Sequence, residues 1–585
     1  MPFRGHDHVC IQLNRKAVMR RIVLGGLALA ATASLVLSGC TSGGTESAPK
    51  EKTKGATSES EVLTAYNPQP ASNLQQGGKM TLPIVEIPDQ LNPLHGDGSL
   101  YTSKIAWFYQ PQLSFNDPKG NITYNPDYLA DVKQATVDGK TQITYDINPQ
   151  AKWNDGQDID WTAFRDTWNA LNGKNKDYVV GSTDGYSSIT SVAKGKDAKQ
   201  AIVTFSGPFV YWKSLFSTLV NPHIAKADAF NKAYVSTPHA EWGAGPYTIS
   251  KFDAKGGTVT YKPNPKWWGA KPHLDEFTFV QMEVSASLNA FKNGQIDAVQ
   301  AANAEELNQV KSVAGTELRR GTTTSNNLLV FNSTSPQLKD PVVRKALMEG
   351  IDRSQLAKIT FQGLGYTEPL PGSFSLFPFQ KGYQDNFGKL VKFDTEAAKK
   401  ELDAAGWKAG ADGVRAKGGE KLELTFPTIG DSATVKARAT AIAQMMKNIG
   451  VKLNIEARPS ADFNKVFTKR AFDIFGMGFI SSDPNGMLYI CQMYCSDSTL
   501  NVSRSVPKSM DEEVKAVTNL PTLDEQIAAG NKVELKAMET YGIMPIHNGP
   551  TIWAVKKGLA NYGAAQFYGN YGVIGAPELI GWEKK

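Results

Sequence analysis

The residues whose spacing could support nucleophilic catalysis are two Ser-x-x-Lys pairs, Ser191 with Lys194 and Ser505 with Lys508. In penicillin-binding enzymes the serine of this motif attacks an acyl group. Neither pair opens an apolar helix, and the Ser-Asp-Asn and Lys-Thr-Gly motifs that accompany this chemistry do not occur. The sequence also lacks the G-x-S-x-G, Walker and H-E-x-x-H motifs. We therefore predict that the protein is not an enzyme.

Metal and cofactor chemistry is not indicated either, and we expect no cofactor. The histidines after residue 40 are scattered without the spacing of a metal site; they are His95, His223, His239, His273 and His547. Cys491 and Cys495 form a C-x3-C pair with no nearby His or second Cys pair, which argues against zinc. A local disulfide is the favoured interpretation, and two free buried thiols are the alternative.

Binding chemistry is indicated by residues 478–485, GFISSDPN, which follow a predicted strand. In α/β folds, ligands bind at the carboxyl ends of strands. We therefore predict ligand contacts from Phe479, Ser481, Ser482 and Asp483. The alternative interpretation of Asp483 is an Asp-Pro turn with structural hydrogen bonds only.

Two further candidates lie elsewhere in the chain. Trp107, Phe108 and Tyr109 are consecutive, so they cannot all face one core, and we include Tyr109 among the predicted ligand contacts. Core packing is the alternative. Asn332 ends a predicted strand, and its amide can both donate and accept hydrogen bonds, which suits a peptide or a sugar. Capping of the strand edge is the alternative for Asn332.

These candidates need a framework of strands and helices, and residues 243–300 supply its clearest part. The pattern predicts, in order, strands at 258–261 and 277–281, a helix with Val284, Leu288 and Phe291 on one face, a stop at Gly294 and a strand at 296–299. A strand, helix and strand with short joints predict a parallel crossover unit.

A second strand–helix–strand set lies within residues 422–455 and is independent of the first. Single cores stop growing at about 250–300 residues, so a chain of 585 residues needs at least two lobes. The sequence therefore predicts an α/β fold with two lobes.

The ordered set GxGPY, NPxWWGxKPxLDEFTF and NGQID within residues 243–300 resembles the core signature of family 5 extracellular solute-binding proteins, the peptide and nickel receptors of ABC importers. The segment DPVVRKALMEGIDRSQL at 340–356 is also similar to a family motif, and the resemblance runs from about residue 79 to the C-terminus. It implies a two-lobed periplasmic-binding-protein-like fold of type II, with the extra subdomain of the peptide-binding cluster and a ligand cleft between the lobes.

The resemblance also implies where the lobes divide. We expect the first lobe at 79–323, with the extra subdomain at about 118–235. The second lobe is expected at 324–545, and residues 546–585 are expected to return to the first lobe.

For the site, residues 478–485 are similar to a family segment in which an Asp soon after a Trp receives the amine of the peptide. Here Phe479 replaces the Trp, and Ser481 and Ser482 occupy the region of that Asp. Asp483 with Pro484 matches a later Asp-Pro pair or a shortened version of the segment. The resemblance therefore implies Asp483 as an amine anchor; if Asp483 is not one, the ligand is expected to lack a free amine.

The N-terminus predicts an export signal at 1–39, because basic residues precede an apolar run at 22–37 that is short of the roughly 20 residues of a membrane span. A transmembrane helix is the alternative. The ending Leu-Ser-Gly-Cys resembles a bacterial lipobox, in which Cys40 is lipidated, and residues 40–78 read as a flexible tether. Without residues 1–39 the net charge falls from +6 to +2, so nucleic acid is not an indicated partner.

Together, these features predict a lipid-anchored substrate-binding component of an ABC importer on the extracytoplasmic face of the cell membrane. We expect a monomer that captures di- or oligopeptides and meets permease subunits. An oligosaccharide, a nickel chelate or haem is the alternative cargo. A surface receptor for a peptide signal is the alternative role.

Overall fold

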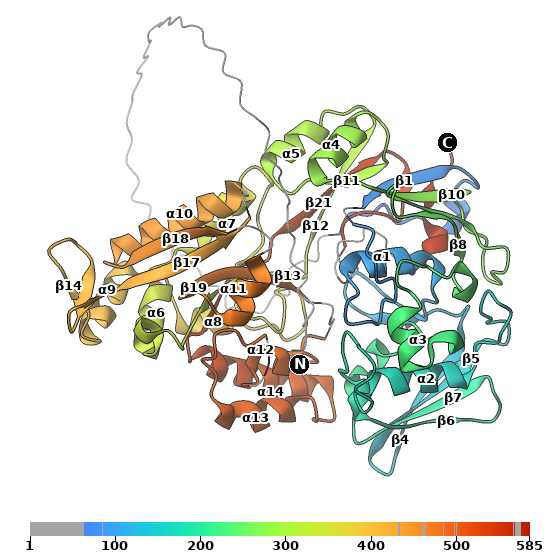
Figure 1. The fold of residues 1–585 in the computed structure, drawn as a ribbon, viewed down its shortest axis with the longest axis horizontal. Helices are drawn as coiled ribbons and strands as arrows, with labels where there is room; N and C mark the ends of the chain where they lie inside the picture. The colour runs from blue at the N-terminus through green and yellow to red at the C-terminus, as the bar shows by residue number, and fades with distance from the viewer. Residues whose placement is uncertain are drawn as a thin grey trace, which may run out of the picture.

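A computed structural model gives the fold, and it describes residues 64–84, 86–430, 433–458, 462–481, 483, 485–496, 498, 500–565, 567 and 575–585. The elements form two lobes, and strands β12 (Thr316–Thr322) and β21 (Pro550–Lys556) run between them (Figure 1). The predicted signal peptide and Cys40 lie outside the described residues. Within the described ranges, no helix has the length and apolar character that a membrane crossing requires.

The first lobe is built on a four-stranded sheet in the order β1-β10-β9-β8, in which β1 and β10 are parallel. Helix α1 covers this sheet, and the Phe108 ring stacks on Phe277 at 4.3 Å between ring centres. The elements are β1 (Lys79–Ile84), α1 (Leu100–Tyr109), β8 (Tyr247–Asp253), β9 (Thr258–Pro263) and β10 (Glu276–Gln281).

A second sheet in this lobe has the order β4-β5-β7-β6 and is antiparallel throughout. We call this sheet, with the helix and loops between its strands, the β4–β7 unit. Its elements are β4 (Leu129–Val137), β5 (Lys140–Ile147), α2 (Trp161–Leu171), β6 (Ile189–Lys194) and β7 (Gln200–Phe205). Flanking it are β2 (Ser114–Asn116), β3 (Ile122–Tyr124), the 3-10 turn Val210–Ser214 and α3 (Ala227–Lys232).

The predicted strand–helix–strand unit is present, but its strands do not pair with each other. After β10 come α4 (Val284–Lys292), a left-handed Gly294 and β11 (Ala298–Gln300). The expected parallel pairing is wrong, because β10 pairs with β1 whereas β11 pairs with β21 in the antiparallel sheet β11-β21-β12. Helix α5 (Ala304–Val310) follows β11.

The C-terminal segment completes the first lobe. After β21, strands β22 (Leu559–Ala560) and β23 (Gly581–Trp582) pair with each other. Val555, Leu559, Tyr562 and Ile580 share one buried cluster with Met80 of β1. Residues at the two ends of the described chain therefore build one core.

The second lobe contains the sheet β19-β13-β20 and the parallel pair β17 and β18. Helix α10 connects β17 to β18 and packs on both strands, so the crossover predicted within 422–455 is confirmed. The elements are β13 (Ser325–Phe331), β17 (Glu423–Ile429), α10 (Ala433–Asn448), β18 (Lys452–Arg458), β19 (Ile474–Ile480) and β20 (Ile543–His547).

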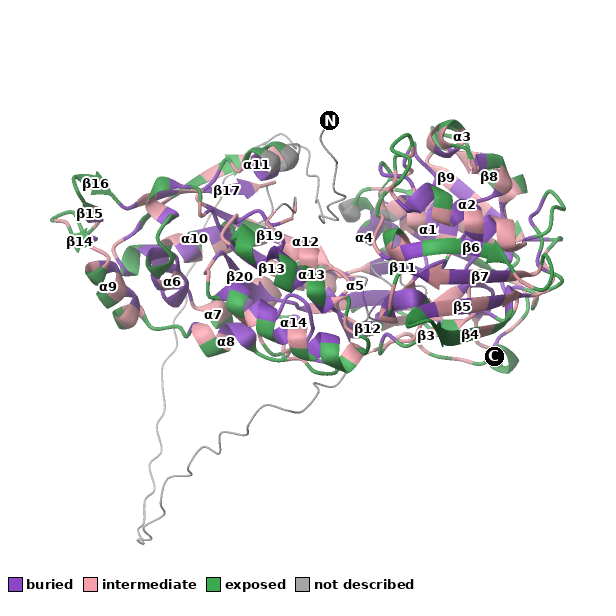
Figure 2. Cartoon of the chain, turned by 90° about the horizontal axis from the view of Figure 1, so that it is seen from below, coloured by how far each residue is buried: buried purple, intermediate pink, exposed green. Residues whose placement is uncertain are grey.

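The other helices of this lobe cover the sheets, and Figure 2 shows buried strands beneath helices whose outer faces are exposed. They are α6 (Pro341–Glu349), α7 (Arg353–Phe361), α8 (Asn386–Leu390), α9 (Thr395–Ala404), α11 (Phe463–Lys469), α12 (Ile490–Tyr494), α13 (Asp511–Val517) and α14 (Leu523–Met538). A small sheet of β14 (Lys408–Ala409), β15 (Arg415–Lys417) and β16 (Glu420–Lys421) projects beside α9.

Candidate functional site

The carboxyl edge of the sheet β19-β13-β20 holds three of the predicted ligand contacts, Phe479, Ser481 and Asp483. Strands β19 and β20 both run antiparallel to β13, so they are parallel to each other and end at the same edge. Phe479 pairs with Asn326, and His547 pairs with Asn327. The Ser481 amide then donates to the carbonyl of Thr324 at 2.9 Å, which leads the chain into the predicted loop.

Asp483 shapes this loop from within. Its side chain is 2% exposed, and its two carboxylate oxygens accept from the amides of Asn485 and Leu488, each at 2.9 Å. Burial raises the pKa of Asp483 to about 6 although these hydrogen bonds oppose the shift. The contacts are those of a structural turn, and the role as an amine anchor stays a prediction. Ser482 lies outside the described residues.

Asn332 lies at the opposite end of β13. A strand rises about 3.3 Å per residue, which separates Asn332 from the carboxyl edge by roughly 20 Å. Its amide donates to the carbonyl of Phe472 at 2.9 Å and accepts from the hydroxyl of Thr334 at 2.7 Å. Asn332 lines a separate cavity of about 270 Å³ together with Thr334, Ser335, Thr425 and Arg470. The structure therefore does not bring Asn332 together with the loop after β19.

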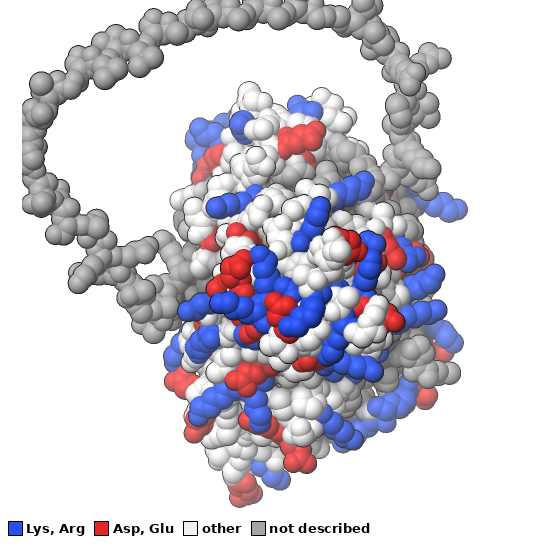
Figure 3. Space-filling model, turned by 90° about the vertical axis from the view of Figure 1, so that its left-hand side faces the viewer, with Lys and Arg blue, Asp and Glu red and all other residues white. Residues whose placement is uncertain are grey.

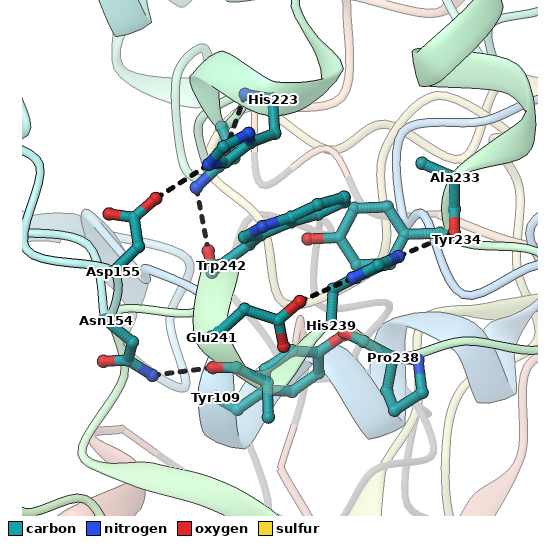
Figure 4. Close-up of polar contacts among 12 residues, drawn as sticks. Tyr109, Asn154, Asp155, His223, Ala233, Tyr234, Pro238, His239, Glu241 and Trp242 are labelled. Atoms are coloured by element: carbon teal, nitrogen blue, oxygen red, sulfur yellow. Dashed lines mark hydrogen bonds and ion pairs between the residues drawn. The ribbon is translucent and has the colours of Figure 1, made fainter.

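Tyr109 lies in the interior of the first lobe. It is 0% exposed, and its hydroxyl donates to the carbonyl of Pro238 at 2.8 Å (Figure 4). Its own carbonyl accepts from the amides of Ala244 and Gly245, each at 2.9 Å. A β-carbon on Gly243 would approach that carbonyl oxygen to 2.5 Å, which explains the glycine in GAGPY. These contacts connect α1 to the start of β8.

Beside Tyr109, the indole of Trp242 lies between two histidines (Figure 4). The ring of His239 stacks on Trp242 at 3.5 Å between centres, and the ring of His223 stacks at 4.9 Å. His239 also contacts Glu241 at 2.7 Å, and His223 contacts Asp155 at 2.9 Å. The cluster joins the turn before α2 to the segment before β8. Sequence reasoning missed it, because no motif relates histidines that are so far apart in the chain.

The two lobes contact each other next to the loop after β19. Gln492 of α12 donates to Asp184 of the β4–β7 unit at 2.7 Å. Nearby, Tyr211 is fully buried, and burial and the charge of Asp483 raise the pKa of its phenol above the usual value. The second lobe therefore meets the first through the β4–β7 unit.

A disulfide between Cys491 and Cys495 brackets Gln492. It closes the single turn of α12, whose Tyr494 donates to Glu534 of α14 at 3.0 Å. The hydroxyl of Ser498 also donates to the carbonyl of Gln492, at 2.5 Å. Gln492 is therefore presented to the first lobe from a segment with several attachments to its own lobe.

A buried lysine in the first lobe was also missed. Lys104 of α1 is 7% exposed, and its ammonium lies 5.4 Å from the ring centre of Phe279. Burial lowers the pKa of Lys104 to about 8. Among the residues that the structure describes, no carboxylate pairs with it. The sequence signal was available, since Lys104 precedes Phe108 by one helical turn on a face that packs against the sheet.

The charge distribution does not favour a polyanionic partner at the distal end of the second lobe. Figure 3 shows acidic and basic side chains interspersed over this face. In the described ranges, no three His, Cys, Asp or Glu side chains are grouped so that they could hold a metal ion.

Comparisons with known proteins agree with this architecture. The family model for bacterial extracellular solute-binding proteins, family 5 Middle, matches residues 124–501. The oligopeptide-binding protein OppA of Mycobacterium tuberculosis is 30% identical over 545 residues, which cover 91% of this chain and 90% of that protein.

Two solved structures are similar in fold. The periplasmic EDTA-binding protein EppA has a TM-score of 0.81 at 23% identity, covering 90% of this chain and 100% of its own. The oligopeptide-binding protein AppA from Bacillus subtilis, in complex with a nonapeptide, has a TM-score of 0.68 at 19% identity, covering 88% of this chain and 100% of its own.

Proposed function

Because the chain belongs to the bacterial extracellular solute-binding proteins of family 5, we propose that it captures a peptide between its two lobes and delivers it to an ABC importer. Members of this family are solute receptors, so the prediction that the chain is not an enzyme is confirmed. The predicted two-lobed fold is confirmed as well. A receptor of this family is located outside the cytoplasm.

The observation that carries the proposal is the contact between the lobes beside the loop after β19. Gln492 and Asp184 join the lobes at 2.7 Å, next to the carboxyl edge where α/β folds bind ligands. A ligand held at that edge would be covered by the first lobe, and its binding free energy would favour closure. Peptide is the proposed cargo because the relative from Mycobacterium tuberculosis is named an oligopeptide-binding protein.

Within this proposal, Phe479, Ser481, Ser482 and Asp483 border the ligand. The backbone before Asp483 would pair with an extended peptide, which gives affinity without dependence on side chains. The buried contacts of Tyr109 and Asn332 favour supporting roles for both residues.

We further propose that lipidation of Cys40 anchors the protein and that a tether after it lets the lobes reach the permease. The expected bound of the tether at residue 78 is wrong, because Ala65 and Leu74 pair with Ala564 and Glu583 and Leu74 is buried, so the tether ends before residue 65. The remaining partners in this proposal are the permease subunits and their ATPases. The receptor itself works as a monomer.

A thermal-shift experiment tests the cargo. The probes are a pool of synthetic pentapeptides, a nickel–histidine complex and a maltooligosaccharide mixture. Peptide at 100 times its Kd should stabilise the protein by roughly 2.7 kcal/mol and raise Tm, while the other two leave Tm unchanged. If only the nickel complex or only the sugars raise Tm, that ligand and not peptide is the cargo. Cleavage of the peptides by the pure protein would contradict the receptor function.

A change of Gln492 tests the closed arrangement. Gln492→Ala removes a hydrogen bond to a carboxylate, which is worth about 1.5–3 kcal/mol, so we expect peptide binding to weaken by roughly ten- to a hundredfold with little change in Tm of the free protein. Isothermal titration measures the affinity. Gln295→Ala, at an exposed position of the first lobe, is the control and should bind normally.

Asp184→Ala should weaken peptide binding as much as Gln492→Ala. The double variant should bind no more weakly than either single variant, since both changes remove the same hydrogen bond between the lobes. Additive losses would mean that the two residues act separately. Unchanged affinity in all three variants would show that this contact does not stabilise the ligand-bound state.

A further inference from the structure

A polar cavity lies at the edge of the sheet β19-β13-β20 that is opposite the predicted ligand loop. It has a volume of about 270 Å³, and its lining includes Asn332, Thr425, Arg470 and Asp473. Asn332 follows the C-terminal end of β13, and Asp473 comes directly before β19. Because β13 and β19 are antiparallel, these two residues mark one edge of the sheet. The length of β13 therefore separates this cavity from the proposed position of the peptide.

Arg470 is the cation of this cavity, and its guanidinium has no carboxylate partner. It directly follows α11 and is partly buried. Among the residues that the structure describes, no Asp or Glu forms an ion pair with Arg470. Burial and the charge of Arg504 both lower the pKa of Arg470. A guanidinium that loses water without gaining an acceptor is costly, so Arg470 is primed for an anion.

Arg504 brings a second guanidinium to the same region. The segment 332–335 lies between the two arginines' stretches of chain, since the amide of Asn332 donates to the carbonyl of Asp473 at 2.9 Å and the amide of Ser333 donates to the carbonyl of Ser503 at 3.0 Å. Arg504 donates to the carbonyl of Ser496, and in the described part of the chain it forms no ion pair either. Two like charges held near each other repel, and a bound anion relieves that repulsion.

Asp473 does not neutralise these arginines. One of its carboxylate oxygens accepts from the hydroxyl of Ser335, and the other accepts from the amide of Thr425 at 2.7 Å. These neutral donors attach the carboxylate to β17, to which Thr425 belongs. The guanidinium of Arg470 therefore shares the cavity with Asp473 without pairing with it.

The number and placement of the cations indicate the kind of anion. A carboxylate is planar, and a single guanidinium matches it with two parallel hydrogen bonds. A phosphate group has oxygens in several directions and carries up to two negative charges at pH 7. Two guanidinium groups on different sides of a cavity therefore suit a phosphate group better than a carboxylate.

We propose that Arg470 and Arg504 form a site for a single phosphate group on the second lobe, separate from the peptide cleft. Arg470 supplies paired donors in the cavity, and Arg504 supplies the second charge. The phosphate group belongs either to a free phosphate or phosphate ester or to the headgroup of an anionic lipid, which a lipid-anchored protein would meet. The site uses no residue of the loop after β19, so it does not depend on the identity of the cargo.

The first experiment uses inorganic phosphate as the probe. Full-length protein is titrated with sodium phosphate at pH 7 against sodium chloride at equal ionic strength, and Tm is recorded. Phosphate should raise Tm of the wild type, and Arg470→Gln should weaken the apparent affinity about tenfold or more, because hydrogen bonds to a charged group are lost. Arg504→Gln should weaken it by a similar factor, and Arg470→Lys should recover part of the loss.

Lys469→Gln is the matched control, because it removes an exposed cation from the preceding residue and should respond like the wild type. Phosphate also stabilises folded proteins by its exclusion from their surfaces, so the differences between variants are the readout. Sodium acetate is titrated in parallel. If acetate binds as tightly as phosphate and depends equally on Arg470, the assignment to phosphate is wrong.

The second experiment identifies the source of the phosphate group. Glycerol 3-phosphate and two soluble short-chain lipids, dihexanoylphosphatidylglycerol and dihexanoylphosphatidylcholine, are titrated in the same way. Tm shifts with inorganic phosphate and glycerol 3-phosphate would identify a free phosphate or phosphate ester. A shift with dihexanoylphosphatidylglycerol, without one from inorganic phosphate or the zwitterionic phosphatidylcholine, would identify the headgroup of an anionic lipid. In either case Arg470→Gln should diminish the shift.

The outcomes keep this site distinct from the proposed peptide function. If no peptide binds the wild type but a phosphate compound still distinguishes Arg470→Gln, the peptide function is wrong and the phosphate site stands. Arg470→Gln should bind peptides as the wild type does. If every phosphate compound shifts Tm of the wild type and Arg470→Gln equally, the phosphate site is refuted.

Discussion

Replacing Glu534 by alanine should lower the free energy of unfolding by roughly 3–5 kcal/mol. Glu534 of α14 is 1% exposed, and its carboxylate accepts from four buried donors. These are the amides of Phe374 and Ser375, the side-chain amide of Asn386 and the phenol of Tyr494, at 2.9–3.1 Å. Alanine leaves all four donors unpaired, and each carries its own desolvation cost. Guanidinium unfolding followed by circular dichroism measures the loss.

Two companion variants sharpen this prediction. Glu534→Gln keeps one acceptor oxygen but turns its NH2 group toward a donor. Its free energy of unfolding should therefore lie between those of the wild type and Glu534→Ala. Glu539→Ala, at an exposed site one and a half turns later, is the control and should change the unfolding free energy by no more than about 0.5 kcal/mol. Since Tyr494 belongs to α12, Glu534→Ala should also weaken the contact between Gln492 and Asp184. A loss below about 1 kcal/mol would mean that water satisfies the four donors.

Replacing Lys104 by methionine should stabilise the protein at pH 7. Burial lowers the pKa of Lys104 from 10.5 to about 8, which corresponds to a cost of roughly 3 kcal/mol for holding the charged form in the fold. Methionine keeps the packing against Phe279 without the charge. Lys262→Met, on an exposed position of the same sheet, is the control and should leave the stability nearly unchanged.

The pH dependence gives this prediction a second readout. Between about pH 8 and 10.5 the folded protein has released the Lys104 proton while the unfolded chain still holds it. The unfolded state then binds more protons, so the stability of the wild type rises through this window. Lys104→Met should lack that contribution. A destabilised Lys104→Met variant would show that the ammonium has a stabilising partner in solution.

Where the signal is local, sequence predicts this fold well. The crossover of β17, α10 and β18 follows from apolar periodicity, and α6 begins where Asp340 and Pro341 place it, with Asp340 accepting from the amide of Val342 at 2.9 Å. The error in pairing β11 has an equally clear cause. Its partner β21 begins about 250 residues later, and no pattern in a three-residue strand specifies so distant a neighbour.

The candidate site divides in the same way. The loop after β19 was found because it follows a strand, which is a local signal. The Gln492–Asp184 contact joins residues 308 positions apart, and only the arrangement of the lobes brings them together. Asn332 follows the C-terminal end of β13, which was expected to lie at the carboxyl edge. Because β13 is antiparallel to β19 and β20, its C-terminal end lies at the opposite edge, and the sequence does not reveal this pairing.

The position of β21 has a consequence for biogenesis. Because β21 is the central strand between β11 and β12, and Leu559, Tyr562 and Ile580 help to fill the core around β1, this core cannot be completed before residues 550–580 have been synthesised. The first lobe therefore stays incomplete throughout the synthesis of the second lobe.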